Sequence, residues 1–353
     1  MSDWFYEYGL FLAQAVTVVV AIAVIIGLLT RLKGSGEGAG TNKLTIRERN
    51  AHLRKHREQL EDARLDKALR AKQAKARRKA QKAEQKALKK HKPSDDGAIA
   101  KPIVWVLDFH GDIRASRTHA FSEEISALLL TAKQGDEVVV RLESGGGLVH
   151  AYGLASAQLD RLREAGIQLT VCVDKVAASG GYMMACCADR LLAAPFAVIG
   201  SIGVVAQIPN VHRLLKKNDV DVEVLTAGKH KRTLTVLGEN TEEGKAKFLE
   251  DLQETHDLFK SFVAQRRPGL DIDKVADGDI WYGSQAVEEG LVDAVTTSEA
   301  YLQSKLDEAR ILEIALKPKR SLMDRIGKQA TLAIEHGVER VIERVANTRW
   351  EKH

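Results

Sequence analysis

Ser179 stands in a sequence context that could supply a nucleophile. An apolar run at 168–173 predicts a strand before it, and a helix is expected to begin just after it. A serine held on such a strand-to-helix turn can expose its hydroxyl, and the helix amino terminus stabilises developing negative charge. The local pattern A-x-S-x-G differs by one residue from the nucleophile elbow of α/β-hydrolases. Because serine is also a frequent helix cap, the local sequence permits both interpretations and favours capping.

Two other glycine-containing turns also follow predicted strands. Residues 143–147 read Glu-Ser-Gly-Gly-Gly after the run at 138–142, and residues 200–204 read Gly-Ser-Ile-Gly-Val. Turns at the carboxyl ends of parallel strands are where open α/β sheets place their sites. Free backbone N–H groups at 145–147 could form an oxyanion hole or hold a phosphate. This turn lacks the Gly-Lys-Ser/Thr of a Walker loop, and no G-x-G-x-x-G opens a helix here.

A nucleophilic serine needs a base, and the local sequence leaves two classes of base open. Four histidines stand in no context that selects one of them, so a Ser-His-Asp triad remains possible; they are His110, His150, His212 and His230. A lysine could serve instead if burial lowered its pKa from about 10.4 to near 7. The segment 227–232 offers Lys229 and Lys231, and the local sequence does not choose between them. A solvated basic loop is the plainer interpretation of that segment.

These residues lie in a region, 101–316, where apolar runs alternate with amphipathic stretches. The alternation predicts an α/β fold with a mostly parallel sheet that is covered on both faces. The predicted strands are 103–109, 138–142, 168–173 and 222–225, and the predicted helices are 122–132, 151–165, one after Ser179, and 240–266. The cysteines at 172, 186 and 187 have apolar neighbours, which indicates buried thiols rather than a disulfide scaffold or a metal site.

Residues 9–29 form an apolar run that only Gln14 and Thr17 interrupt. These 21 residues, at about 1.5 Å rise each, can cover a hydrocarbon core of roughly 30 Å. A cleaved signal peptide would carry a basic n-region, whereas the residues before this run include Asp3 and Glu7 and no basic residue. We therefore expect one uncleaved transmembrane helix at 9–29.

The region 31–100 is expected to be a basic stalk. Residues 31–92 hold 21 Lys and Arg against 7 Asp and Glu, and the glycine-rich segment 34–40 predicts a flexible spacer. The stretch that follows can be helical, but it has little apolar periodicity with which to bury a core. A solvated helix and a patch lying on anionic lipid headgroups are both consistent with this composition. No aromatic residue interleaves the charges, which argues against nucleic-acid binding.

The formal net charge of +5 conceals a strong asymmetry along the chain. The net charge is −2 over 1–30, +14 over 31–92, −11 over 93–316 and +4 over 317–353. By the positive-inside rule the basic flank stays in the cytoplasm, so the acidic body is expected on the cytoplasmic side of the membrane, with a periplasmic body as the alternative. The last segment, 317–353, has apolar residues at steps of three and four, which predicts an amphipathic helix.

Five short motifs follow one another in a consistent order over about residues 102–300. They are Ser-Gly-Gly-Gly at 144–147, Val-Ala-Ala-Ser-Gly-Gly-Tyr at 176–182, Gly-Ser-Ile-Gly-Val at 200–204, Gly-Lys-His-Lys at 228–231, and Trp-Tyr-Gly-Ser-Gln-Ala at 281–286 with Gly-Leu-Val-Asp at 290–293. Together they resemble the SppA/SohB family of membrane-bound serine proteases, the signal peptide peptidase type. Gly145 stands where that family usually has proline, which makes the turn less rigid but removes no hydrogen-bond donor.

The resemblance implies a ClpP/crotonase-like fold with a Ser-Lys dyad. Ser179 would be the nucleophile and Lys231 the general base, which leaves the other lysine of that segment a bystander. Ser201 would orient the lysine amine, and the backbone N–H groups of Gly147 and Gly180 would form the oxyanion hole. The resemblance also implies a homo-oligomeric ring in which neighbouring subunits line the substrate groove.

The function expected from these features is that of a single-pass serine endopeptidase of a bacterial inner membrane, acting without cofactor or metal. Its substrates would be peptides, such as signal-peptide remnants or fragments of membrane and misfolded proteins. One alternative is a crotonase-type acyl-CoA enzyme, which shares the fold and the oxyanion hole. Another is a non-catalytic membrane scaffold in which Ser179 only caps a helix.

Overall fold

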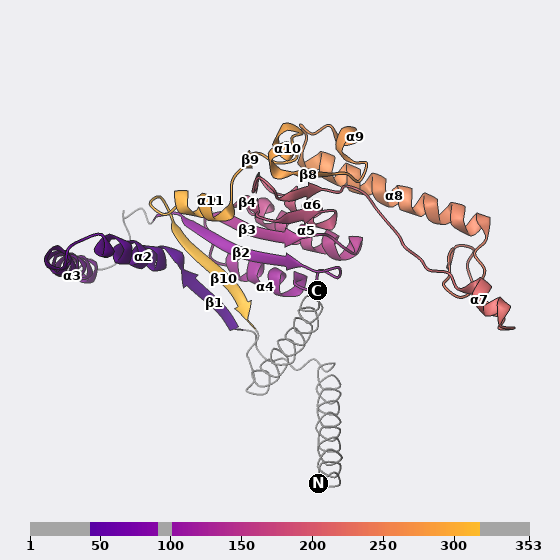
Figure 1. Cartoon of the computed structure of the whole chain (residues 1–353), viewed down its shortest axis with the longest axis horizontal. Helices are drawn as coiled ribbons and strands as arrows, with labels where there is room; N and C mark the ends of the chain where they lie inside the picture. The colour runs from indigo at the N-terminus through magenta and orange to yellow at the C-terminus, as the bar shows by residue number, and fades with distance from the viewer. Residues whose placement is uncertain (1–42, 91–100, 318–353) are drawn as a thin grey trace, which may run out of the picture. The chain divides into compact units, whose positions relative to one another are not determined.

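The computed structural model describes residues 43–90 and 101–317, and Leu44–Leu316 form one compact unit (Figure 1). The predicted anchor at 9–29 and the predicted helix within 317–353 lie outside the described residues, apart from Lys317. Among the helices of the described ranges, 43–90 and 101–317, none combines the length and the apolar character that crossing a membrane requires.

Strands and helices alternate along the described chain. The strands are β1 (Lys43–Glu48), β2 (Ile103–Gly111), β3 (Glu137–Ser144), β4 (Gln168–Val173), β5 (Val176–Ala178), β6 (Arg190–Ala193), β7 (Val198–Gly200), β8 (Ile280–Tyr282), β9 (Ala294–Val295) and β10 (Arg310–Lys317). The helices are α2 (Arg49–Ala63), α3 (Lys67–Lys90), α4 (Thr118–Leu129), α5 (Val149–Glu164), α6 (Gly180–Ala185), α7 (His212–Lys217), α8 (Glu242–Arg266), α9 (Ile272–Val275), α10 (Gly283–Glu288) and α11 (Ser298–Ser304).

The strands form one sheet in the order β1-β10-β2-β3-β4-β6-β9, and a short branch of β5, β7 and β8 leaves it at β3. From β10 to β9 the neighbouring strands run parallel, and so do β3 with β5 and β5 with β7. Among the strand pairs other than β1–β10, only β7 and β8 run antiparallel. The largely parallel α/β sheet that the sequence predicts is therefore confirmed.

Both faces of the sheet are buried, which explains why β2 and β3 are almost continuously apolar. On one face Leu107 and Phe109 pack with Phe121 of α4 and with α5 and α6. On the other face Val106 and Val139 pack with α11. Each fully buried aliphatic or aromatic side chain contributes about 1.5–3 kcal/mol of hydrophobic stabilisation. The three cysteines are unpaired and buried, as predicted, and burial raises the pKa of Cys172 to about 12.

Most of the predicted elements correspond to observed ones, and one does not. The strands at 103–109, 138–142 and 168–173 are β2, β3 and β4, and the helix after Ser179 is α6. The helix predicted at 240–266 is α8, where the Thr241 hydroxyl accepts from the Gly244 N–H and caps the amino terminus. The strand predicted at 222–225 is wrong: this segment pairs with no strand, and the side chain of Leu225 is 89% exposed. Its alternating valines have no neighbouring edge with which to form a ladder.

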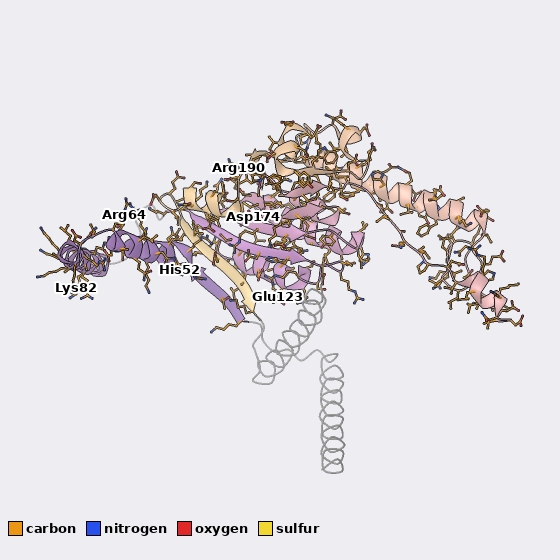
Figure 2. The ribbon with its side chains drawn as sticks, viewed as in Figure 1. His52, Arg64, Lys82, Glu123, Asp174 and Arg190 are labelled. Carbon is orange, nitrogen blue, oxygen red and sulfur yellow. The ribbon has the colours of Figure 1, made fainter. Side chains whose placement is uncertain are left out.

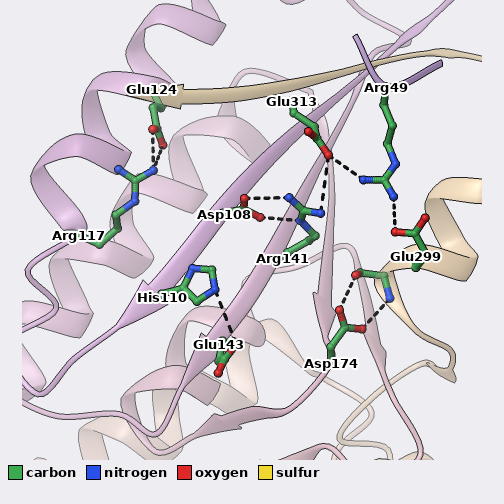
Figure 3. Close-up of polar contacts among 11 residues, drawn as sticks. Arg49, Asp108, His110, Arg117, Glu124, Arg141, Glu143, Asp174, Glu299 and Glu313 are labelled. Carbon is green, nitrogen blue, oxygen red and sulfur yellow. Dashed lines mark hydrogen bonds and ion pairs between the residues drawn. The ribbon is translucent and has the colours of Figure 1, made fainter. Parts of the chain in front are cut away.

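The start of the predicted stalk is part of the sheet. Strand β1 lies next to β10, and Asn50, at the start of α2, is buried beneath it. Its side-chain amide donates to the carbonyls of Leu306 and Ala309 at 3.0 and 2.9 Å, and its oxygen accepts from Ile311 N at 2.7 Å. Arg49 forms ion pairs with two carboxylates of the body, Glu299 and Glu313 (Figure 3). Residues 43–50 therefore belong to the folded body, although the sequence placed them in the stalk.

Beyond residue 50 the stalk is helical. Helices α2 and α3 form a hairpin in which Arg77 pairs with Glu61 at 2.7 Å and with Asp62 at 2.9 Å. Figure 2 shows polar side chains projecting along this hairpin, among them His52 of α2, Arg64 at the turn and Lys82 of α3. Helix α3 carries 11 Lys and Arg and one Glu in 24 residues, so the basic charge predicted for the stalk is concentrated there.

Candidate active site

The three glycine-containing turns meet because their strands are neighbours. Ser144 at the end of β3 lies opposite Ala177 of β5, and Ala178 lies opposite Gly200 of β7. The chain leaves each of these parallel strands at the same edge of the sheet. Ser179 N donates to the Gly200 carbonyl at 2.8 Å, so Ser179 and Ser201 follow two adjacent strands.

Ser179 has a backbone conformation that is rare for a residue with a side chain. Its φ is 52° and its ψ is −120°, at the turn between β5 and α6. Such a conformation costs about 1–3 kcal/mol and tends to occur at functional sites. Although Ser179 occupies the N-cap position of α6, its side chain forms no capping hydrogen bond. The hydroxyl is therefore not used as a helix cap, the interpretation that the local sequence favoured.

The turn around Ser179 leaves no room for side chains on two glycines. A Cβ on Gly180 would lie 2.6 Å from Cγ of the buried Tyr152, and a Cβ on Gly146 would lie 2.8 Å from the Ser179 Cβ. Gly146 also has a φ of 88°, which glycine adopts at little cost. The glycine turn thus packs directly against the serine and the start of α6.

Ser201 repeats the geometry of Ser179 on the neighbouring strand. Its φ is 51°, and its N–H donates to the Asp279 carbonyl at 2.6 Å. Gly200 before it packs against the Trp281 ring, which a Cβ would approach to 2.6 Å. Within the described ranges, the hydroxyls of Ser179 and Ser201 form no hydrogen bond with another residue. Both serines are half-buried, and their hydroxyls have no partner in the described ranges that would compete with a substrate or a base.

Two backbone N–H groups at this site are also available. In the part of the chain that the structure describes, the amides of Gly147 and Gly180 donate to no acceptor, whereas Gly146 N donates to Ser144 Oγ at 3.1 Å. The Gly180 amide is the first of α6, so the helix itself provides no partner for it. A carbonyl oxygen that became negative beside Ser179 would find these two donors unoccupied.

Lys231 lies elsewhere in the chain. Its N–H closes a turn onto the Gly228 carbonyl at 3.1 Å, its side chain is exposed, and nearby Lys229 pairs with Glu243 on the first turn of α8 at 3.0 Å. Helix α8 meets the body further along, where the His256 ring contacts the Ile202 carbonyl at 3.3 Å. Glu243 and His256 are thirteen positions apart along α8, which corresponds to a rise of about 20 Å. Within one chain, the segment between α7 and α8 that contains Lys231 therefore lies at the end of α8 away from the sheet (Figure 1).

None of the four candidate histidines takes the place of the lysine in the described part of the chain. Among the described residues, none of His110, His150, His212 and His230 forms a hydrogen bond with Ser179. His110 instead lies 3.7 Å from Glu143 on the surface (Figure 3). The described ranges also contain no group of three His, Cys, Asp or Glu side chains that could hold a metal ion.

Several residues that pack against the turns of the site were not predicted from the sequence. Tyr152 contacts Ser144 of the glycine turn and donates to the Asp112 carbonyl, and Asp279 and Trp281 hold the Ser201 turn. The only signal for Tyr152 was an aromatic hydroxyl on the apolar face of the helix that follows the glycines. Its partners are far apart in sequence, so no local pattern connects them.

The fold and site together define a hydrolase-like α/β protein with a half-buried, uncapped serine hydroxyl beside unoccupied backbone amides. Residues 3–159 match the model described as Peptidase family S49 N-terminal, and residues 161–312 match the model described as Peptidase family S49. The chain belongs to peptidase family S49, and it is accordingly a peptidase, of a family to which a serine mechanism fits.

Several proteins of similar sequence are also described as proteases. The chain is 50% identical over 334 residues to the probable protease SohB of Haemophilus influenzae, which covers 94% of each chain. It is 60% identical over 204 residues to the probable protease SohB of Buchnera aphidicola, covering 58% of this chain and 67% of that one. A putative protease of Methanocaldococcus jannaschii is 31% identical over 193 residues, covering 52% of this chain and 61% of that protein.

Proposed function

We propose that this protein is a membrane-anchored serine endopeptidase that cleaves peptides with a Ser179–Lys231 dyad. The observation that carries the proposal is the conformation of Ser179, whose uncapped hydroxyl lies beside Ser201 and the free amides of Gly147 and Gly180. A serine that only capped α6 would need neither the positive φ nor the close-packed glycines around it.

The proposed reaction is acyl transfer to water. Neutral Lys231 takes the Ser179 proton as Oγ attacks the peptide carbonyl, and the resulting oxyanion accepts hydrogen bonds from Gly147 and Gly180. The lysine then gives its proton to the leaving amine. A water molecule, activated by the amine of Lys231, then hydrolyses the acyl-enzyme and releases Ser179. Ser201 orients the lysine amine throughout.

The dyad is formed between two copies of the chain. Lys231 of one copy reaches Ser179 of the next, because within one chain helix α8 holds the Lys231 segment away from the site. Exposed apolar side chains around α7 and α8 support such a contact between copies. They include Val205, Leu214, Leu225, Leu249 and Leu258, which are 61–91% exposed.

The proposed anchor and stalk determine where the active site lies relative to the membrane. We infer a transmembrane helix at 9–29, a basic stalk within 31–100 that contacts anionic lipid, a protease domain over 101–316 and an amphipathic helix in 317–353. The protease domain lies on the cytoplasmic side of a bacterial inner membrane, as the charge distribution predicts. The substrates are signal-peptide remnants and fragments of membrane or misfolded proteins, which are generated next to such a site.

Single substitutions test the dyad. Ser179→Ala and Lys231→Ala should each abolish cleavage of casein or an unfolded peptide by the full-length protein in detergent. Lys229→Ala is the matched control, because this lysine lies two residues away and pairs with Glu243; it should retain activity. Cleavage that survives in either dyad variant would refute the assignment.

Mixing the two inactive variants tests the contribution from a second copy. In a ring with head-to-tail contacts, a random equal mixture of Ser179→Ala and Lys231→Ala chains should recover roughly a quarter of the sites. If both residues came from one chain, the mixture would stay inactive. The matched family is a peptidase family, so the acyl-CoA alternative has no support, and thioester turnover is the assay that would revive it.

A further inference from the structure

Tyr152 on α5 contacts both sides of the oxyanion hole. Its side chain is fully buried, and its ring packs under Gly180, whose Cβ, if present, would be 2.6 Å from Tyr152 Cγ. Its hydroxyl lies 2.5 Å from the Oγ of Ser144, which is also buried and precedes the glycine turn. One side chain therefore adjoins the segments that supply both amide donors.

The hydrogen bonds around this hydroxyl have a single consistent direction. The Asp112 carbonyl, 2.7 Å from Tyr152 Oη, can only accept, so the tyrosine proton points to it. Tyr152 Oη must then accept the proton of Ser144 Oγ. Ser144 Oγ in turn accepts from Gly146 N at 3.1 Å. The result is a chain of donors from the Gly146 amide to the Asp112 carbonyl, and its members polarise one another.

This chain determines which amide of the turn remains for a substrate. Gly146 N–H is committed to Ser144, and Leu148 N–H donates to the Ile113 carbonyl at 2.8 Å. Between them, Gly147 N–H is left without an acceptor in the described part of the chain. The segment at 112–113 thus holds the turn on both sides of Gly147.

We propose that Tyr152 is a positioning residue for the oxyanion hole, acting through Ser144 on the glycine turn and through its ring on Gly180. The inference rests on the proposed function, since a hole is required only if Ser179 attacks a carbonyl. Without the tyrosine hydroxyl, Ser144 is free to rotate and release Gly146, and the Gly147 donor loses its fixed direction. The dyad itself is untouched, so the loss falls on the transition state rather than on substrate binding.

The test compares variants of the full-length protein in detergent. Tyr152→Phe keeps the ring against Gly180 and removes the hydroxyl, and Ser144→Ala removes the middle of the chain. Tyr301→Phe is the matched control, because its buried hydroxyl bonds Glu137 at 2.5 Å in the other hydrophobic cluster. We expect Tyr152→Phe and Ser144→Ala each to lower kcat by about 10- to 100-fold with KM unchanged. The double variant should lose little more than either single one.

The affinity for a peptide aldehyde distinguishes a positioning role of Tyr152 from a purely structural one. The adduct of the aldehyde with Ser179 places an oxyanion in the hole, whereas a product peptide does not. The aldehyde should bind Tyr152→Phe about 10- to 100-fold more weakly, and the product peptide should bind as before. Equal weakening of both ligands, or values matching those of Tyr301→Phe, would overturn the role of Tyr152 alone.

Failure of the proposed function would give a different result from failure of the inference about Tyr152. If the unsubstituted protein neither cleaved peptides nor bound the aldehyde, the proposed function would fall and this inference with it. If Tyr152→Phe did not fold, the aldehyde affinity of Ser144→Ala would carry the same test. An unchanged affinity in that variant would overturn the inference.

Discussion

Arg267 and Asp293 form a two-point ion pair that ties the chain after α8 to the sheet. Their atoms meet at 2.8 Å (Nη2 to Oδ1) and 3.2 Å (Nη1 to Oδ2), and Oδ2 also accepts from Leu191 N on β6 at 2.6 Å. Asp293 is the last residue of the Gly-Leu-Val-Asp motif on which the family resemblance partly rests. The motif aspartate therefore joins the chain after α8 to the backbone of β6.

This pair should make stability depend on pH in acid. Burial raises the pKa of Asp293, but the hydrogen bonds from Arg267 and Leu191 outweigh it, and the net pKa lies below the ordinary value of 3.8. A depressed pKa contributes stability above about 3.8 that is lost as the pH falls through the folded-state pKa. Asp293→Asn should thus lower the free energy of unfolding by about 1 kcal/mol at pH 7, a modest value because solvent screens the partly exposed carboxylate.

Urea unfolding between pH 2 and pH 7 would measure this effect. The difference between Asp293→Asn and the unsubstituted protein should shrink as the pH falls below about 3.8. Asp221→Asn is the control, because its exposed carboxylate meets only Lys216, at 3.7 Å. A constant difference at every pH would contradict the assignment to ionised Asp293.

Two glycine-to-alanine substitutions should have opposite effects. Gly180→Ala places a methyl group 2.6 Å from the buried Tyr152 ring, so it should cost about 1–3 kcal/mol of stability and at least about 10-fold in kcat. Gly153→Ala, in α5, meets nothing within 4 Å and should stabilise the protein by about 0.5–1 kcal/mol. Thermal unfolding and peptide cleavage measured on both variants would check the pair. A fully active Gly180→Ala would show that the close approach is unnecessary.

Asn50 should matter for stability although it lies in the predicted stalk. Asn50→Ala removes three hydrogen bonds, two of them buried, and leaves Ile311 N without its partner, so we expect a loss of about 2–3 kcal/mol. Asn218→Ala, an exposed residue that bonds only the Leu214 carbonyl, should change stability by less than about 0.5 kcal/mol. Denaturant midpoints of the two variants would give the comparison. Equal midpoints would mean that β1 and α2 do not contribute to the folded body.

Replacing Ser201 should lower activity without lowering stability. Ser201→Gly removes the hydroxyl proposed to orient the lysine, while glycine accepts the φ of 51° without strain. We expect kcat to fall about 10- to 100-fold while the unfolding temperature stays the same or rises. Ser284→Ala, whose hydroxyl bonds the Pro195 carbonyl at the surface, should leave kcat unchanged. A Ser201→Gly variant with normal kcat would remove this serine from the mechanism.

Local patterns were sufficient for the features that depend on neighbouring residues. The apolar runs of β2, β3 and β4, the Thr241 cap of α8 and the glycine turns around Ser144 and Ser179 are all formed by residues close in sequence. Each imposes its conformation locally, so reading the chain in order predicts the parallel sheet and the edge at which the site lies.

Tertiary structure decided what depends on contacts between distant segments. The Val and Leu residues at 222–225 alternate like a strand but have no edge to join, whereas the charged segment Lys43–Glu48 is a strand because β10 offers one. The separation of Lys231 from Ser179 follows from the length of α8 and from where that helix meets the body. The link from Gly146 through Ser144 and Tyr152 to Asp112 joins three elements, and only their packing brings these groups within hydrogen-bonding distance.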